Sequence, residues 1–397
     1  MNNDRITVTI INQWFGEPLT GPSERFRRYA PGLLKRGINI RVIAGLGKDD
    51  PNYEIIDGIP INHIPVTSQK DNHELLKRAL KFCRQTGEWP NVFNLLAHDH
   101  KNILKILLTK LLYGVPFIWI STMVKMPDRI RVNWIKRIRE FIRVQLFSLP
   151  LNYIVTSSKV MADYWISLGV IRNKIEIIPN GVDLKRFRPP NSLAERNIIR
   201  QQLKIDLEDE IVLFVGSIVQ RKGVDTLISA WNEISTKREK AKLFLVGERR
   251  DNPTFLKQIE TMVAKSIHPE RITFFGSVQN VEKFMQAADL FVFPSRYEGM
   301  PNVVPEAMAC GLACIITPFD GLPEEFGRSG HEYCLIENTP SDLSLAVLGL
   351  LENENLRHSY AQLGSAWVKS NLDVEVSLNQ YEKLYRKLSK GSHKKYL

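Results

Sequence analysis

The sequence predicts an α/β protein of two doubly wound domains, each with a parallel sheet. Apolar runs rich in β-branched residues alternate with helical patterns, and this alternation begins twice, near residue 6 and again near residue 211. A chain of 397 residues is long enough for two domains with separate cores. An extended, proline-containing connector, LKRFRPPN, follows the first half. We therefore expect the junction within 184–196, with domains over 1–185 and 186–373 and a helix and tail over 374–397.

The first half opens with ITVTIIN, whose β-branched residues predict a buried strand. A loop rich in glycine and proline follows over Phe15–Pro22, and a helical pattern then runs from Glu24 to Arg36. Gly37 ends this helix before the next strand, Ile38–Ala44, so these segments form a βαβ unit. Further strands, each followed by a helical segment, are predicted at Val92–Ala97, Pro116–Ile120 and Asn152–Thr156.

The end of the first half is marked by KIEIIPNGVD at 174–183, in which a short strand runs into Pro179 and Asn180-Gly181 favours a turn. The second half then repeats the alternation of strands and helices. Its predicted strands are Ile211–Val215, Lys242–Val246, Ile272–Phe275, Leu290–Phe293 and Ala313–Ile316. Its predicted helices are Val224–Ile234, Thr254–Ser266, Val281–Ala288 and Pro305–Cys310, and a basic helix follows over Val374–Lys390.

The composition indicates a globular protein of a reducing compartment. Apolar and charged contents of 44% and 24% are ordinary for such a protein, and no apolar run reaches the roughly 20 residues that span a bilayer. The first residues lack the ordered regions of a signal peptide. The four cysteines suggest reduced thiols, and Cys310 and Cys314 have no neighbouring residues to complete a metal site. We expect a cytoplasmic location.

The net charge of +11 is unevenly distributed between the halves. Residues 1–190 hold 29 Lys and Arg against 16 Asp and Glu, a net charge of +13, and the remainder holds 25 against 27. The asymmetry predicts different partners for the two halves, with an anionic partner for the first.

The segment FVFPSRYEGMPNVVPEAMACGLAC, residues 291–314, carries the clearest functional pattern. An apolar strand is followed by a Pro-Ser-Arg-Tyr break, then Glu298, and then a helical segment with Glu306. Backbone N–H groups at a helix N-terminus suit a phosphate, and the two carboxylates can accept hydrogen bonds from hydroxyls on either side of it. The pattern favours a nucleotide sugar as ligand, although two glutamates at this spacing also occur in purely structural helices.

This segment resembles the Glu-x7-Glu signature of the retaining glycosyltransferases of family 4. Their GT-B fold has two Rossmann-like domains facing across a cleft and a C-terminal helix that crosses back to the first domain. The resemblance implies transfer of a sugar from a nucleotide-diphosphate donor to an acceptor hydroxyl. It implies that Glu306 holds the ribose hydroxyls and that Glu298 faces the transferred sugar. Backbone N–H groups would hold the sugar and the distal phosphate around Gly299, Met300, Asn302 and Val303.

The loop after the first strand of the second half contains Arg221 and Lys222. Two cations at the mouth of a strand-to-helix loop suit a diphosphate leaving group, although such a pair on a surface is usually only solvated. The loop is similar to the family's G-R-L-x-x-x-K-G motif, in which Lys222 matches the lysine and Ser217 replaces the arginine. The resemblance implies that Arg221 supplies the second charge and that backbone groups near Val278 contact the nucleotide base.

In the first half, Gly16 and Gly21 suit a close backbone approach to phosphates. The family has two adjacent glycines here, whereas this chain has Gly21-Pro22. Because Pro22 lacks an N–H group, Ser23 or Gly16 would take over its contact.

The sequence Ala97-His98-Asp99-His100 places two histidines at the predicted end of a strand. The pattern is compatible with a general base, a metal site or a structural role. The position of the family's catalytic-site histidine falls on Thr122 in this chain. We therefore expect His98 or His100 at the reaction centre.

A basic amphipathic helix is predicted over 129–147, RIRVNWIKRIREFIRVQLF. Its apolar face holds Trp134, Ile135, Ile138, Phe141, Ile142 and Leu146, and its basic face holds Lys136, Arg137, Arg139 and Arg143. This pattern is typical of a helix on an anionic membrane surface and equally of a surface helix packed on its own domain. In the acceptor-side domain of a GT-B fold it would suit a lipid-linked acceptor, with a free saccharide as the other acceptor class.

Other functions fit the sequence less well. No Asp-x-Asp motif stands at a strand end, so we expect transfer without a metal ion or a cofactor. Epimerases and phosphorylases share the two-domain architecture, but the Glu298/Glu306 pair with the Lys222 loop favours transfer. The absence of G-x-G-x-x-G argues against a dehydrogenase, and no motif supports nucleic-acid binding by the basic half. The resemblance implies surface polysaccharide or glycolipid assembly; sugar, base, acceptor and oligomeric state stay open.

Overall fold

The computed structural model describes residues 5–13, 21–46, 51–66, 72–96, 98, 100–121, 134–319, 322 and 324–390. The chain forms two compact units: unit 1 comprises 1–180 with 374–397, and unit 2 comprises 181–373. Unit 1 therefore ends five residues before the predicted boundary at 185. The reason is packing, because the side chains of Val182 and Phe187 are already buried in the core of unit 2.

Unit 1 is built on an eight-stranded sheet in the order β3-β4-β2-β1-β5-β6-β7-β8. Its pairs are parallel except for β3 with β4. The strands are β1 (Ile6–Asn12), β2 (Ile38–Leu46), β3 (Tyr53–Ile56), β4 (Ile59–Pro65), β5 (Val92–Leu95), β6 (Phe117–Ser121), β7 (Tyr153–Thr156) and β8 (Ile175–Ile177). The parallel order confirms the predicted doubly wound α/β class.

The β3–β4 hairpin is absent from the sequence-based prediction. Its turn is Asp57-Gly58, and both residues have positive φ angles, 51° and 79°. An Asp-Gly pair between alternating apolar residues is a strong hairpin signal, because it accommodates the left-handed conformation that a two-residue turn needs.

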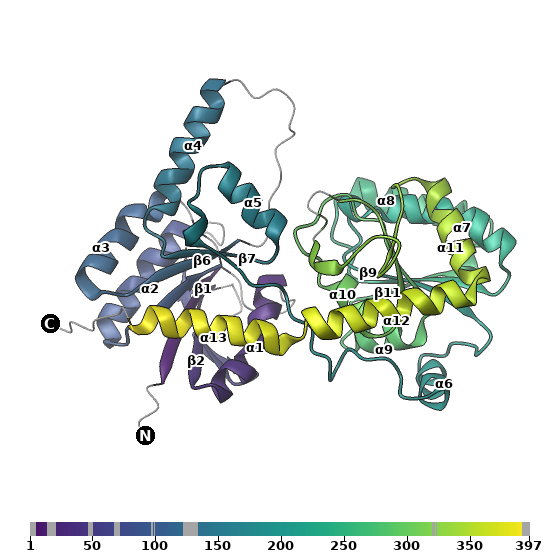
Figure 1. Ribbon diagram of the computed structural model, residues 1–397, viewed down its shortest axis with the longest axis horizontal. Helices are drawn as coiled ribbons and strands as arrows, with labels where there is room; N and C mark the ends of the chain where they lie inside the picture. Colours follow the sequence, from purple (N-terminus) through teal and green to yellow (C-terminus); the bar gives the residue numbers. More distant parts are fainter. Residues whose placement is uncertain are drawn as a thin grey trace. The chain divides into compact units, whose positions relative to one another are not determined.

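Helices cover both faces of this sheet (Figure 1). They are α1 (Gly21–Lys35), α2 (Asn72–Thr86), α3 (Ile103–Tyr113), α4 (Trp134–Ser148), α5 (Lys159–Ser167) and α13 (Val374–Lys390). One core cluster lies under α1 and α13, and a second lies under α2 on the opposite face. Helix α1 begins three residues earlier than predicted, because Pro22 stands in its first turn, where a missing N–H group costs nothing.

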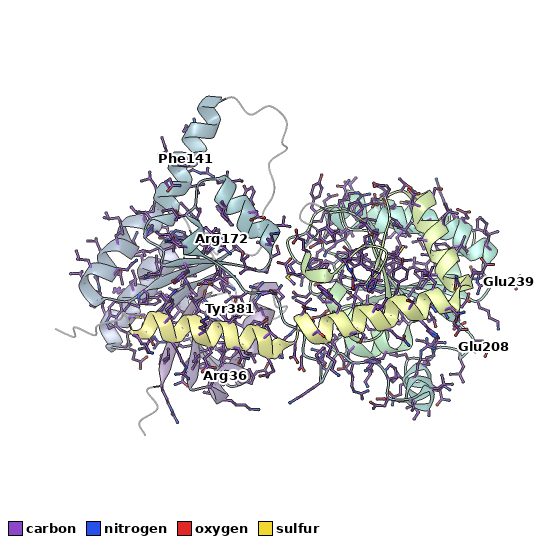
Figure 2. All side chains as sticks on the ribbon, viewed as in Figure 1. Arg36, Phe141, Arg172, Glu208, Glu239 and Tyr381 are labelled. Carbon is purple, nitrogen blue, oxygen red and sulfur yellow. The ribbon has the colours of Figure 1, made fainter. Side chains whose placement is uncertain are left out.

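Helix α13 follows unit 2 in the chain but packs into the core of unit 1. Its Tyr381 contacts the rings of Phe26 and Tyr29 on α1 at centroid distances of 5.9 and 5.7 Å (Figure 2). Asn94 on β5 donates a hydrogen bond from Nδ2 to the buried Tyr385 hydroxyl at 2.9 Å. These contacts confirm the C-terminal helix that the GT-B resemblance implies.

Unit 2 has a six-stranded, fully parallel sheet in the order β11-β10-β9-β12-β13-β14. The strands are β9 (Glu210–Val215), β10 (Ala241–Val246), β11 (Ile272–Gly276), β12 (Leu290–Phe293), β13 (Ala313–Ile316) and β14 (Cys334–Leu335). The helices are α6 (Leu193–Gln202), α7 (Val224–Lys237), α8 (Pro253–Ala264), α9 (Val281–Ala287), α10 (Val303–Ala309), α11 (Pro340–Glu352) and α12 (Glu354–Asn371).

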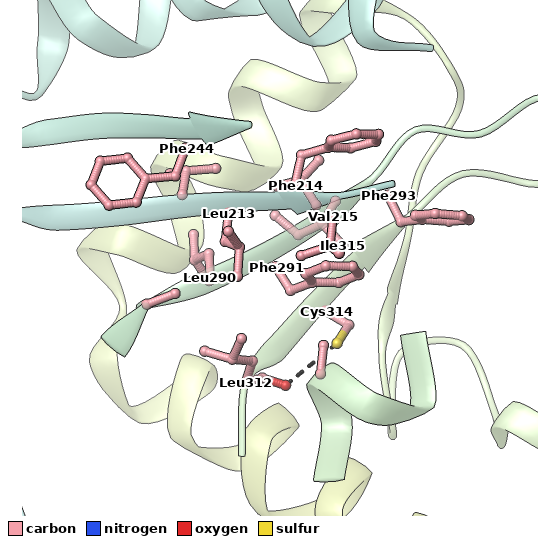
Figure 3. Packing of buried hydrophobic residues seen from close by; sticks show 14 of the residues in the cluster. Leu213, Phe214, Val215, Phe244, Leu290, Phe291, Phe293, Leu312, Cys314 and Ile315 are labelled. Carbon is pink, nitrogen blue, oxygen red and sulfur yellow. Dashed lines mark hydrogen bonds between the residues drawn. The ribbon is translucent and has the colours of Figure 1, made fainter. Parts of the chain in front are cut away.

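The central strands of unit 2 are buried on both faces, as their uninterrupted apolar sequences predict. Phe214, Phe291 and Phe293 pack with Leu213 and Ile315 in one continuous core (Figure 3). This core fixes β9 and β12 side by side, so the loops that follow the two strands meet at one edge of the sheet.

Candidate functional site

The loops after β9 and β12 touch through their backbones. Gly223, which precedes α7, has a φ angle of +68°, and a Cβ atom at this position would lie 1.9 Å from the carbonyl oxygen of Pro294. Only glycine tolerates both the left-handed conformation and this approach. The contact fixes Arg221 and Lys222, in a short 3₁₀ helix (Gln220–Lys222), against the segment that contains Glu298.

Three donors converge on one oxygen of Glu298. Arg221 Nη1 and Lys222 Nζ each lie 2.6 Å from Glu298 Oε1, and the Ser295 hydroxyl donates to the same atom at 2.8 Å. Charge-assisted hydrogen bonds of this length are among the stronger ones in proteins. The structure therefore brings the two cations of one motif together with the first glutamate of the other.

Lys222 is 8% exposed, which is rare for a lysine. Its ammonium also lies 4.6 Å from the ring centroid of Phe293, at the end of β12. Burial lowers the pKa of Lys222 from its ordinary value of 10.5, and the Glu298 carboxylate opposes this shift. The site thus holds a buried cation whose charge depends on an anionic neighbour.

Arg296 joins the two loops beneath this cluster. Its guanidinium binds both carboxylate oxygens of Asp225 at 3.0 and 2.9 Å, and its backbone N–H donates to the Arg221 carbonyl at 2.8 Å. The Asn338 amide donates to the Pro294 carbonyl at 2.9 Å. Sequence reasoning missed this support, since it depends on pairs 71 and 44 residues apart.

Glu306 lies on α10, whose first residue is Val303, two positions before the predicted start. Glu306 is only 4% exposed, and its backbone N–H donates to the Asn302 carbonyl at 3.1 Å. Gly299 and Met300 are buried in the segment between β12 and α10. The two glutamates therefore stand on the same strand-to-helix connection, one before the helix and one in its first turn.

The neighbouring loops pack equally closely. A Cβ atom at Gly247, after β10, would lie 2.0 Å from the Gly216 carbonyl oxygen, so the loop that carries Ser217 passes directly against the next loop. The Gly247 N–H donates to the Gly276 carbonyl at 2.8 Å. Val278, two residues further on, packs against the core of unit 2. Ser217 follows β9 and Val278 follows β11, on either side of β10, so both lie at the same edge of the sheet.

In unit 1, His98 is anchored by aromatic packing. Its Nε2 lies 3.1 Å from the Phe147 carbonyl oxygen, and its ring packs on Phe147 at a centroid distance of 4.2 Å. Trp119 and Trp165 complete the aromatic cluster. A role at the reaction centre stays a prediction.

The other candidates in unit 1 are only partly described. Gly21 was predicted to lie in a loop, but it is the first residue of α1. His100 begins a short 3₁₀ helix, and its side chain is not among those described. Gly16, Asp99 and Thr122 lie outside the described residues. Among the residues that are described, no three His, Cys, Asp or Glu side chains are grouped so that they could hold a metal ion.

Comparison with known proteins gives two family matches that together cover most of the chain. Residues 20–186 match the model described as Glycosyltransferase Family 4, and residues 195–367 match the model described as Glycosyl transferases group 1. The chain is 29% identical over 232 residues to the N,N'-diacetylbacillosaminyl-diphospho-undecaprenol alpha-1,3-N-acetylgalactosaminyltransferase of Campylobacter jejuni. That match covers 58% of this chain and 59% of the relative.

Two solved structures share the fold over nearly the whole chain. HepE of Anabaena, in complex with UDP and glucose, superposes with a TM-score of 0.76 at 16% identity, covering 96% of this chain and 100% of that one. Sucrose-phosphate synthase of Thermosynechococcus elongatus superposes with a TM-score of 0.78 at 20% identity, covering 98% of this chain and 100% of that one. In sequence, the chain spans about half to three fifths of the length of curated relatives that it matches: 59%, 59% and 49% for three of them.

Proposed function

Because this chain belongs to glycosyltransferase family 4 and has the GT-B fold, we propose that it is a retaining enzyme that uses a nucleotide-diphosphate sugar. In the proposed reaction, the sugar passes to an acceptor hydroxyl with its anomeric configuration unchanged. The nucleoside diphosphate is the leaving group.

The observation that carries the proposal is the pair of cations on Glu298. Arg221 and Lys222 meet one carboxylate oxygen at 2.6 Å each, at the carboxyl edge of a parallel sheet. Ligands of open α/β sheets bind at this edge. Fixed cations in a site from which water is excluded stabilise the negative charge that develops on a departing diphosphate.

The other residues take roles around this centre. Glu306 accepts hydrogen bonds from the ribose hydroxyls, and Glu298 faces the transferred sugar. The backbone from Gly299 to Val303, with Gly16 and Gly21 of unit 1, contributes to the sugar and phosphate contacts, and the loops at Ser217 and Val278 contact the nucleotide. His98 is the candidate from unit 1 for contact with the reacting sugar.

We propose that leaving-group stabilisation comes from Lys222 and Arg221 and that no divalent ion or cofactor takes part. The two protein cations that meet at Glu298 support this proposal, because fixed cations can neutralise a departing diphosphate. Turnover that is lost with EDTA and restored by magnesium would contradict this part of the proposal.

The acceptor is proposed to be a lipid-linked or free saccharide of surface polysaccharide or glycolipid assembly. The name of the Campylobacter jejuni relative specifies a diphospho-undecaprenol-linked acceptor, and HepE was solved with UDP and glucose. These relatives support a nucleotide-sugar donor and leave UDP, GDP and other bases to be tested.

The test is a thermal-shift panel of nucleoside diphosphates and nucleotide sugars on the full chain, with Glu306→Gln beside it. A ligand that binds only the native state stabilises it by about 2.7 kcal/mol at a hundredfold excess over Kd. We expect one nucleotide to raise the melting temperature of the wild type and to do so much less in Glu306→Gln. The matched control is Glu208→Gln, the same chemical change at an exposed carboxylate paired with Lys240.

Three outcomes separate the possibilities. A shift lost only in Glu306→Gln supports the donor site and identifies the base. No shift with any nucleotide overturns the donor proposal. Once a donor is known, proton NMR of the first-formed product reports its anomeric configuration, and inversion would overturn the retaining mechanism.

A further inference from the structure

Helix α3 carries a stripe of exposed leucines that no described part of unit 1 covers. These residues recur with helical spacing on one face: Leu104, Leu107, Leu108, Leu111 and Leu112. Leu111 is 80% exposed, whereas Ile106 and Thr109 on the opposite face are buried. Isolated exposed leucines are ordinary on protein surfaces, but five on one helix face make a patch of the kind that marks an interaction site.

Helix α4 extends this patch. Ile142, Leu146 and Leu149 are exposed, whereas Val144 is buried in the core of unit 1 and the half-exposed ring of Phe141 (Figure 2) packs against Gly169. Lys110, in the last turn of α3, donates from Nζ to the Pro150 carbonyl at 3.0 Å, just beyond the end of α4. The C-terminal ends of the two helices therefore lie together. We call the exposed apolar residues of α3 and α4 the α3–α4 face.

The α3–α4 face lies in the most basic part of the chain. Residues 101–150 contain ten Lys and Arg against two Asp and Glu, a net charge of +8 in 50 residues. The segment 100–121, which includes all of α3, contains three lysines and no acidic residue. Lys101, Arg139 and Arg143 are exposed. Exposed apolar and cationic side chains thus occur together on α4 and on α3 with the turn before it.

We propose that the α3–α4 face docks unit 1 on an anionic lipid bilayer, with the leucines in the acyl boundary and the cations against the headgroups. Burial of apolar side chains and attraction to acidic lipid act together in this mode of binding. Among the described residues, no helix is both long and apolar enough to cross a membrane.

Charge decides between a bilayer and a second copy of the chain as the occupant. A symmetric dimer through this face would place the same basic surface of one copy against that of the other. Like charges facing each other across an interface disfavour association, whereas an anionic bilayer is complementary to them. The inference rests on unit 1 alone and is independent of the donor chemistry proposed for unit 2.

The test is co-sedimentation of the full chain with vesicles of phosphatidylcholine, alone or with about one third phosphatidylglycerol, at low and high salt. The variant is Leu108→Glu with Leu111→Glu, two exposed positions where the change leaves the core intact. Each leucine withdrawn from the acyl boundary is expected to weaken binding by about tenfold or more. The matched control is Leu345→Glu, on α11 of unit 2, where the leucine is 60% exposed.

The expected result is binding to the acidic vesicles only, reduced by salt, retained by Leu345→Glu and lost in the double variant at an unchanged melting temperature. Equal binding of the double variant and the wild type overturns the proposal. So does the absence of binding to acidic vesicles. Concentration-dependent dimerisation that the double variant abolishes would assign the face to a second copy instead.

Discussion

The two units use their cations in opposite ways. In unit 2, Lys222 is buried, its ammonium touches a carboxylate and an aromatic ring, and its loop is fixed by a glycine contact and by the Arg296–Asp225 pair. In the segment 101–150 of unit 1, Lys and Arg outnumber Asp and Glu five to one, and Lys101 and Arg139 are exposed. The buried charge of Lys222 lies at the candidate site, whereas the many exposed cations of unit 1 act together through the positive potential that they produce.

The comparison shows that net charge is a poor guide to where chemistry occurs. Unit 2, which contains the candidate donor site, lies in the half of the chain with the nearly neutral balance. A single cation acts strongly where burial removes the screening by water, whereas exposed cations act only in number and weaken with salt.

The largest expected effect is that of Lys222→Ala. Removing a buried donor that stabilises a developing anion lowers kcat/KM by about 10²- to 10³-fold, by analogy with the removal of an oxyanion-hole donor. Arg139→Ala, which removes an exposed cation of unit 1, is expected to leave kcat/KM for a water-soluble acceptor unchanged. The kcat/KM of each variant is measured from the release of nucleoside diphosphate. Equal losses in the two variants would remove the distinction between buried and exposed cations.

A smaller but still large effect is expected from Gly223→Ala on stability. The new Cβ atom would lie 1.9 Å from the Pro294 carbonyl oxygen in a left-handed backbone conformation, so the loops must separate at a cost of about 2–4 kcal/mol. Gly37→Ala in unit 1 is the matched control. Gly37 also has a positive φ angle, +76°, but no atom lies within 4 Å of the added Cβ, so only the conformational cost of about 1 kcal/mol remains. Urea unfolding of the two variants measures the difference, and equal costs would show that the loop contact does not matter.

The smallest of the three expected effects is a loss of activity at alkaline pH. Since burial lowers the pKa of Lys222, its ammonium is lost at a pH below 10.5, and activity that needs this cation falls there. The free energy of unfolding does not fall over the same pH range, because Lys222 keeps its proton in the unfolded chain there. In the folded chain, loss of the proton removes the cost of burying a charged group. We therefore expect an alkaline loss of activity without unfolding, followed by kinetics and circular dichroism in parallel. Lys222→Arg should move this loss to higher pH, and an unmoved profile would assign it to another group.

Strands β12 and β13 of unit 2 were predictable because they are buried on both faces and so have uninterrupted apolar sequences, whereas the two-residue, partly buried β14 was missed. Leu290–Phe293 and Ala313–Ile316 match the structure at both ends. In unit 1 the two-residue turn at Asp57-Gly58 carried a readable signal for the β3–β4 hairpin that the prediction did not use. The position of the unit boundary depends on which core buries Val182, and a turn signal at Asn180 alone does not determine that.

The candidate site was predictable in its members and not in their contacts. One motif named Arg221 and Lys222 and another named Glu298, but their meeting at one oxygen depends on strand order, which a single sequence does not reveal. The support from Arg296 depends on the same order. Likewise, helical periodicity identifies the leucine stripe on α3 but cannot say whether it faces the core or the solvent.

The attachment of α13 to unit 1 has a consequence for synthesis. On the ribosome, the strands of unit 1 emerge first, but Tyr381, Tyr385 and Leu378, which complete its core over α1, emerge only after all of unit 2 has been made. Once residues 1–180 have been made, the apolar side of α1, including Phe26, must still wait for the translation of unit 2, residues 181–373, which takes on the order of ten to forty seconds at about 5–20 residues per second. Unit 2 is continuous in the chain and has no such delay, so the order in which the two units mature is the reverse of the order in which their synthesis begins.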